Sequence, residues 1–361
     1  MAAGWKPKNQ WVPAASHDEN ADVPITKPAT AARANGAVQR VRAKARETRR
    51  RARLMGVSRI MTLSAEEYRD HLATTAVRAG FSFGEVALPS ERILEVGDLR
   101  FRYLDWGSEG LRPILFLHGG ALTAHTWDLC CLALRDGFHC LALDQRGHGD
   151  SDWAPDADYS IGAQREDVRG FADRLGLDRF VLVGQSMGAI NGLAFAVAHP
   201  ERLSALVMID AGPEVRRRGS HRIRDFVNGS AKSETLDEII ARALTFNPRR
   251  DPQILRRSLM HNLRQEPDGS WRWKYDRRRF QRLDQERQLA ERRGLADGLA
   301  GVTCPVLVVR GADSDVFHEE DAIRLAQNFP DGRHVTIPEA GHTVQGDNPK
   351  ELVAALREFL G

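Results

Sequence analysis

Long apolar runs are missing from this 361-residue chain. No stretch approaches the roughly 18–20 consecutive apolar residues of a membrane-spanning helix, so the sequence predicts no membrane span. The amino-terminal region also lacks the apolar core of a secretion signal. From these two absences we expect a soluble protein that works in the cytoplasm.

Cysteine is scarce as well, with four residues in the whole chain. All four lie in or beside apolar stretches and two are adjacent, a pattern typical of core residues rather than of a disulfide framework: Cys130, Cys131, Cys140 and Cys304. No Cys and His spacing resembles a zinc site. We therefore expect no disulfide framework, no bound metal and no cofactor.

The rest of the composition is ordinary for a globular protein, with 42% hydrophobic and 28% charged residues. The net charge of +3 hides an uneven distribution. Residues 1–75 carry 14 Lys and Arg against 7 Asp and Glu, a net charge of +7. Residues 214–297 carry 21 Lys and Arg against 13 Asp and Glu, a net charge of +8. The remainder of the chain therefore carries −12. Attraction between the basic segment 214–297 and the acidic remainder, or between that segment and an anionic substrate, is physically reasonable.

Residues 1–75 are predicted to be a basic extension, partly disordered and partly helical. Between residues 33 and 59 there are ten Lys and Arg and one acidic residue, Glu47. Such an arm could bind nucleic acid, an anionic membrane surface or an acidic partner. Because no aromatic side chains interleave the charges for base stacking, we favour a solvated extension and do not expect nucleic acid as a partner.

Two local patterns predict the elements that follow this arm. Ser64-Ala-Glu-Glu67 is a capping box that opens a short helix, which Gly80 ends. Residues 92–96 and 99–104 then alternate in hydrophobicity around a Gly-Asp turn, so they predict two antiparallel strands at the edge of a sheet.

The main functional signal is the run Phe180-Val-Leu-Val-Gly-Gln-Ser-Met-Gly188, which predicts a buried strand, a sharp turn and a helix. Ser186 lies at the tip of the turn, after Gln185. The flanking Gly184 and Gly188 are needed because a Cβ atom at either position would clash with nearby backbone. This geometry exposes the Ser186 hydroxyl and directs the N–H of Met187 toward a developing oxyanion.

A serine nucleophile needs a base, an orienting acid and a second oxyanion donor, and the chain supplies all three in order. The apolar run 114–117 precedes His118-Gly119-Gly120, whose backbone N–H groups can face the oxyanion. The apolar run 305–309 precedes a loop that carries Asp313 and Asp315. His342 follows the last predicted strand.

The order Ser, Asp, His, together with the His-Gly-Gly loop and the run Asp144–Ser151, resembles the α/β-hydrolase family over roughly residues 85–361. The resemblance implies an eight-stranded, mostly parallel sheet flanked by helices. It implies a core of residues 85–213 and 298–361, and a helical cap or lid of residues 214–297 inserted after the sixth strand. It also implies that the Asp144–Ser151 loop has mainly a structural role and that His118 braces the oxyanion loop.

In the catalysis that this resemblance implies, Ser186 attacks an acyl carbonyl while His342 accepts its proton. We prefer Asp315 as the acid because Arg310-Gly-Ala-Asp-Ser-Asp-Val resembles relatives in which the acid follows a serine. Asp313 and Asp210, which follows the sixth strand, remain alternatives. Backbone N–H groups of Gly120 and Met187 are expected to hold the oxyanion.

Ser186 also narrows the reaction, since the epoxide hydrolases and haloalkane dehalogenases of this fold use an aspartate at that position. Carboxylester or lactone hydrolysis, C–C bond hydrolysis of diketones, perhydrolysis and acyl transfer remain. We expect a serine esterase or lactonase with a small-molecule ester, lactone or diketone substrate. The basic cap favours, as an alternative, a C–C hydrolase or enol-lactonase that acts on a carboxylate-bearing ring-cleavage product. A second alternative is a non-catalytic polyanion- or partner-binding protein.

The sequence pattern of residues 214–297 predicts helices and no strands. The aromatic cluster Trp271-Arg-Trp-Lys-Tyr275 within it suits either pocket lining or packing of the cap on the core. Trp127, Trp271 and Trp273 are accordingly the candidate pocket residues. The sequence leaves open whether the protein is a monomer or a homo-oligomer.

Overall fold

The computed structural model describes residues 64–214, 235–246, 250–281 and 285–361. The predicted disordered segment and the basic stretch at residues 33–59 lie outside these ranges, and the predicted cap is described only in part. Within the described residues, no helix combines the length and the apolar character that crossing a membrane requires.

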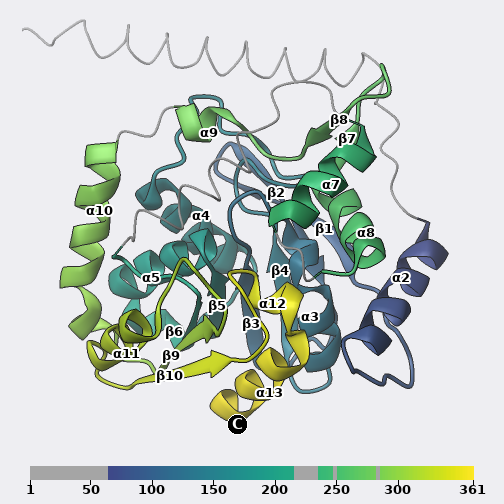
Figure 1. The fold of residues 1–361 in the computed structure, drawn as a ribbon. Coiled ribbons are helices and arrows are strands. Elements are labelled where there is room, and N and C mark those ends of the chain that lie inside the picture. The colour runs from purple at the N-terminus through teal and green to yellow at the C-terminus, as the bar shows by residue number, and fades with distance from the viewer. Residues whose placement is uncertain (1–63, 215–234, 247–249, 282–284) are drawn as a thin grey trace, which may run out of the picture. The chain divides into compact units, whose positions relative to one another are not determined.

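An eight-stranded sheet forms the centre of the fold, in the order β1-β2-β4-β3-β5-β6-β9-β10 (Figure 1). At one side of the sheet, the edge strand β1 is antiparallel to β2 and β2 is antiparallel to β4, whereas all other pairs in the sheet are parallel. The mostly parallel sheet and its antiparallel edge are therefore confirmed. The strands are β1 Ser90–Val96, β2 Leu99–Asp105, β3 Pro113–Leu117, β4 His139–Leu143, β5 Phe180–Gln185, β6 Leu203–Ile209, β9 Val306–Gly311 and β10 Gly332–Ile337.

Helices cover both faces of this sheet, because alternate residues of each central strand point to opposite sides. In β3, Leu115 and Leu117 join the core cluster under α4, α5, α11 and α10 (Gln285–Asp297), whereas Ile114 and Phe116 join the cluster under α2, α3 and α13. All four cysteines are buried and free, as expected of core residues. The helices are α2 Ala65–Arg78, η1 Ala124–Trp127, α3 Asp128–Leu134, α4 Ile161–Arg174, α5 Met187–Ala198, η2 Pro200–Arg202, η3 Leu299–Gly301, α11 Glu319–Gln327, α12 Val344–Asp347 and α13 Pro349–Leu360.

Helix α2 is the predicted helix after the capping box. The Ser64 hydroxyl accepts from the Glu67 N–H, and the Glu67 carboxylate accepts from the Ser64 N–H. Leu72 and Ala76 of this helix are buried, and Leu72 belongs to the core cluster that also contains α3. The predicted boundary at residue 75 is therefore wrong, since it divides a helix that packs on the core.

The insertion between β6 and β9 contains α7 Leu236–Phe246, α8 Pro252–Asn262, α9 Arg278–Gln281 and α10 Gln285–Asp297. It also contains a hairpin of β7 Leu263–Gln265 and β8 Trp271–Trp273, so the expectation of helices without strands is wrong. The two strands flank the turn at residues 267–270, and Trp271 and Trp273 point to the opposite face from Arg272. Trp273 is thereby buried in the cluster formed by α7 and α8.

Candidate active site

Ser186 sits between β5 and α5 in a strained backbone conformation, with φ 53° and ψ −112°. Its N–H donates to the Ile209 carbonyl at 2.9 Å. A Cβ atom on Gly184 would lie 2.3 Å from the Gly188 oxygen, and one on Gly188 would lie 2.2 Å from the Leu117 oxygen. The backbone around this turn is therefore packed so closely that positions 184 and 188 have no room for a Cβ atom, as the sequence predicted.

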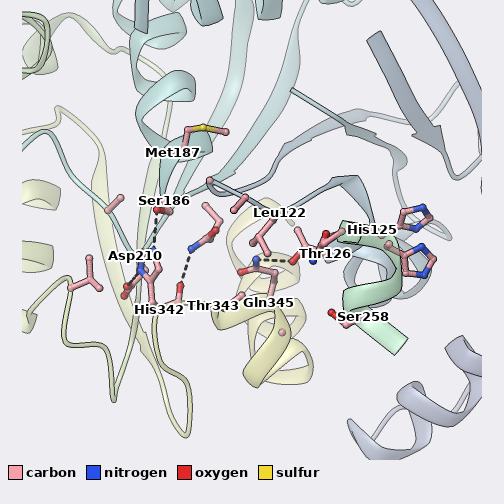
Figure 2. A pocket seen from close by; sticks show the side chains of 18 of the residues that line it. Leu122, His125, Thr126, Ser186, Met187, Asp210, Ser258, His342, Thr343 and Gln345 are labelled. Carbon is pink, nitrogen blue, oxygen red and sulfur yellow. Dashed lines mark hydrogen bonds and ion pairs between the residues drawn. The ribbon is translucent and has the colours of Figure 1, made fainter. Parts of the chain in front are cut away.

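His342 lies on the loop between β10 and α12 and faces the serine (Figure 2). Its Nε2 atom is 3.0 Å from the Ser186 Oγ atom, and its Nδ1 atom is 2.7 Å from Oδ2 of Asp210. The Gln185 side chain donates to the His342 carbonyl at 2.8 Å and so fixes the loop to the end of β5. Three residues from three strand ends therefore form one continuous hydrogen-bonded chain.

The acid beside His342 is Asp210, which corrects the preference for Asp315 and leaves Asp313 unused in this contact. Strands β6 and β9 are neighbours, so the loops after both reach the same edge of the sheet. Asp210 is fully buried and accepts two further hydrogen bonds, from the Gly311 N–H at 3.1 Å and from the Ser314 hydroxyl at 2.6 Å. The loop that carries the expected acid instead supplies donors to Asp210, and Ser314 is a functional candidate that the sequence analysis missed.

The oxyanion loop follows β3 and is held by His118. The His118 Nδ1 atom lies 2.8 Å from the Gly119 carbonyl, and its Nε2 atom accepts from the Gln145 N–H at 3.0 Å. Complete burial lowers the pKa of His118, which keeps the ring neutral and able to make both contacts. Gly120 and Met187 line the same cavity as Ser186.

The loop that starts at Asp144 has a structural role. One Asp144 oxygen accepts from the Ala124 N–H at 2.7 Å and the other from the Asp150 N–H at 3.0 Å. Arg146 forms an ion pair with Asp167 of α4. These contacts tie β4 to the segments around it, as the resemblance implied.

A cavity of about 430 Å³ opens beside Ser186 between the sheet edge and the insertion. Trp273, Leu255 and Leu259 line it from the insertion. Trp127 does not, because it is fully buried in the core against Phe116, and its assignment to the pocket is corrected. Trp271 likewise packs against the α7–α8 cluster and lies outside the cavity lining.

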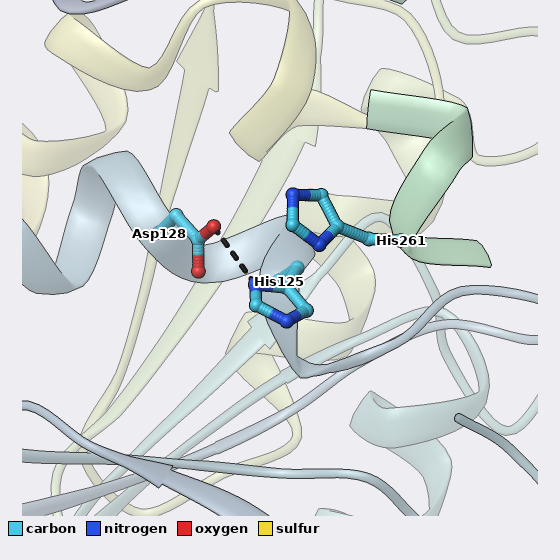
Figure 3. A group of neighbouring side chains, drawn as sticks. All are labelled: His125, Asp128 and His261. Atoms are coloured by element: carbon cyan, nitrogen blue, oxygen red, sulfur yellow. Dashed lines mark hydrogen bonds and ion pairs between the residues drawn. The ribbon is translucent and has the colours of Figure 1, made fainter. Parts of the chain in front are cut away.

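Another part of the cavity wall holds His125, Asp128 and His261, whose ligand-type atoms lie within 4.8 Å of one another (Figure 3). The two imidazole rings stack with centroids 3.8 Å apart, and His125 Nδ1 is 3.0 Å from an Asp128 oxygen. Burial raises the pKa of Asp128 to about 7 and lowers the pKa of both histidines well below their usual value.

Two contacts bear on whether this cluster suits a cation. The Arg102 guanidinium donates to His125 Nε2 at 2.9 Å, and the Tyr68 hydroxyl donates to Asp128 at 2.7 Å. A metal would compete with both donors and would lie close to a fixed positive charge. The cluster therefore fits a hydrogen-bonded link between α2, α3 and α8 better than a metal centre.

Comparison with known proteins identifies the family to which the fold belongs. Residues 112–349 match the family model described as alpha/beta hydrolase fold. The esterase Rv0045c of Mycobacterium tuberculosis is 29% identical over 296 residues, which cover 80% of this chain and 94% of that protein. A crystal structure of that esterase aligns with a TM-score of 0.66 at 28% identity, covering 83% of this chain and 99% of the other.

Two further relatives carry different hydrolase names. The 2-(acetamidomethylene)succinate hydrolase of Mesorhizobium japonicum is 28% identical over 275 residues, which cover 74% of this chain and 94% of that protein. The sn-1-specific diacylglycerol lipase ABHD11 of Mus musculus is 30% identical over 276 residues, which cover 73% of this chain and 85% of that protein. These similarities support a general hydrolase function. The family model matches more than half of the residues of this chain, and the chain therefore belongs to the alpha/beta hydrolase fold family.

Proposed function

We propose that this protein is a serine hydrolase that cleaves a carboxylic ester or lactone through an acyl-enzyme intermediate. The observation that carries the proposal is the hydrogen-bonded chain from the Ser186 hydroxyl through the His342 ring to the Asp210 carboxylate. A serine at this turn has a base within reach, and the base has an acid that orients it.

In the first half of the reaction, Ser186 Oγ attacks the acyl carbonyl carbon and its proton passes to His342 Nε2. The ring then carries a positive charge that the Asp210 carboxylate stabilises. Asp210 also keeps the Nδ1 proton in place, so that Nε2 is the free acceptor in the resting enzyme.

The carbonyl oxygen gains negative charge in the same step. Backbone N–H groups of Gly120 and Met187 are the proposed donors, and each such donor contributes about 3–4 kcal/mol of transition-state stabilisation in comparable enzymes. His342 gives its proton to the leaving alcohol, and then activates a water molecule that attacks the acyl-enzyme. Ser186 is regenerated when the acid product leaves.

The insertion is the proposed cap of this enzyme, with residues 85–213 and 298–361 as the catalytic core. Residues of α8 and β8 line the cavity together with Ser186, so the insertion shapes the space that a substrate would fill. Function in this fold is set by such additions rather than by the sheet. The relatives are named for several different substrates, so their names do not identify one substrate class for this chain. The residues that line its cavity are the better guide.

The test is turnover of p-nitrophenyl acetate, butyrate and octanoate by the wild type and by Ser186→Ala. We expect the wild type to hydrolyse at least one ester and the variant to lose activity by about 10⁵–10⁶-fold, to the background rate. Ser204→Ala is the matched control, because its hydroxyl lies at the start of β6 near Arg112, far along the strand from Ile209. Equal activity of Ser186→Ala and wild type would refute the mechanism.

A further inference from the structure

Two arginines of the insertion line the same cavity as Ser186. Arg279 comes from α9 and Arg292 from α10. An arginine is charged at neutral pH, so its burial requires a compensating partner. The hydrogen-bond and charge partners of these two side chains therefore show whether a ligand could supply a missing one.

Arg279 lacks such compensation in the described part of the chain. Its Nη1 atom is buried and has no hydrogen-bond partner. Burial lowers the pKa of Arg279 to about 10, the charge of Arg292 acts in the same direction, and Tyr159 rather than a carboxylate acts against them. Asp276, which precedes α9, is taken by Arg278 and by the Tyr159 hydroxyl.

Arg292 is held close to the catalytic loops. Its Nη1 atom donates to the Gly212 carbonyl at 3.3 Å, two residues beyond Asp210. Burial lowers the pKa of Arg292 as well. The second guanidinium thus adds positive charge to the cavity, and the group that it contacts at Gly212 is a neutral carbonyl.

We propose that Arg279 and Arg292 form an anion subsite that binds a carboxylate group of the substrate. The planar guanidinium presents paired N–H donors that match a carboxylate, and binding would give the buried Nη1 atom its missing acceptor. Tyr159, Gln164 and Asn191 are further polar residues that line the same cavity. The inference rests on the proposed function, which it narrows to esters or lactones that carry a free carboxylate.

The test compares two esters of the same length with wild-type enzyme at neutral pH: mono-p-nitrophenyl adipate, which ends in a carboxylate, and the matching adipamide ester, which ends in an isosteric neutral amide. We expect kcat/KM to be at least tenfold higher for the anionic ester. In Arg279→Gln the ratio of the two kcat/KM values should fall by about 10–100-fold, the usual effect of losing a charged hydrogen-bond partner. Arg293→Gln removes the same charge from an exposed position of α10 and should keep the wild-type ratio.

Equal kcat/KM values for the two esters in the wild type, or an unchanged ratio in Arg279→Gln, would overturn the inference. If Arg279→Gln does not fold, Arg279→Lys is used instead, because it keeps the charge but loses the planar fork, and its ratio should be lower than that of the wild type. Calorimetric binding of adipate to Ser186→Ala separates the subsite from catalysis. Adipate binding that needs Arg279 supports the subsite even if no ester is hydrolysed, and absent binding in an enzyme that hydrolyses neutral esters contradicts the subsite alone.

Discussion

Asp210 and His342 lie 132 positions apart in the sequence, yet the Asp210 Oδ2 atom is 2.7 Å from the His342 Nδ1 atom. Asp210 directly follows β6, and His342 follows β10, two strands further along the sheet. The contact gives the ring a fixed orientation and a fixed proton position. It also identifies which of three candidate carboxylates would serve the reaction.

Replacing Asp210 should therefore harm catalysis far more than replacing Asp315. Asp210→Asn keeps the shape of the side chain but removes its charge and favours the wrong histidine tautomer, so we expect kcat to fall by about 10³–10⁴-fold. Asp315→Asn should change kcat by less than about threefold. Steady-state kinetics on the best ester decides between the two, and a larger loss in Asp315→Asn would contradict the assignment.

Ser314 is predicted to be a positioning residue. Its hydroxyl donates to the same Asp210 oxygen that faces His342, at 2.6 Å. Ser314→Ala should lower kcat by about 5–20-fold with little change in KM, because one charge-assisted hydrogen bond is lost. Ser314→Thr retains a hydroxyl and should restore part of the loss. An increase in KM at constant kcat would indicate a role in substrate binding instead.

The nucleophile turn should not tolerate a Cβ atom at Gly184. Such an atom would lie 2.3–2.6 Å from the backbone of Gly188 and Ala189, which cannot move without shifting α5. We expect Gly184→Ala to lower the free energy of unfolding by more than about 3 kcal/mol or to prevent folding. Gly162→Ala is the control, since a Cβ there meets no atom within 4 Å. Thermal denaturation of both variants provides the comparison.

Acid should destabilise the fold partly through His71 of α2. Burial lowers the pKa of His71 to about 4, whereas the unfolded chain binds a proton near pH 6.5. The stability contributed by the neutral ring is present above pH 6.5 and is lost as the pH falls toward 4. At pH 5 the loss is about 2 kcal/mol for this one group.

His71→Gln should therefore lose less unfolding free energy between pH 7 and pH 5 than the wild type does, by about 2 kcal/mol. Urea denaturation at the two pH values measures the difference. His334→Gln, at a more exposed position on β10, should lose as much as the wild type. If His71→Gln and the wild type lose the same unfolding free energy between pH 7 and pH 5, then His71 binds its proton as readily in the folded state as in the unfolded state.

The sequence predicted the parts of the site that depend on local geometry. The Gly184, Ser186 and Gly188 pattern specifies a turn with close backbone contacts, and the resemblance to the α/β-hydrolase family implied the eight-stranded sheet. Asp315 was preferred wrongly because the loops after β6 and β9 reach the same edge of the sheet. Which of two loops meets a histidine depends on side-chain packing across strands, and spacing along the chain does not report it.

The remaining differences also come from tertiary packing. Trp127 resembles a pocket residue by type, but η1 buries it under the sheet. The hairpin β7–β8 has only three residues in each strand, too few to distinguish from a loop by periodicity. Arg279 is one of three consecutive arginines, and burial of its Nη1 atom, which is visible only in the folded chain, separates it from Arg278.

The role of Ser186 as nucleophile is tested most directly by the site of covalent labelling with a fluorophosphonate, read by intact-protein and peptide mass spectrometry. We expect one added phosphonyl group on Ser186 in the wild type, much slower labelling in His342→Ala and none in Ser186→Ala. Labelling at another residue, or equal labelling rates in wild type and His342→Ala, would contradict a serine nucleophile activated by His342.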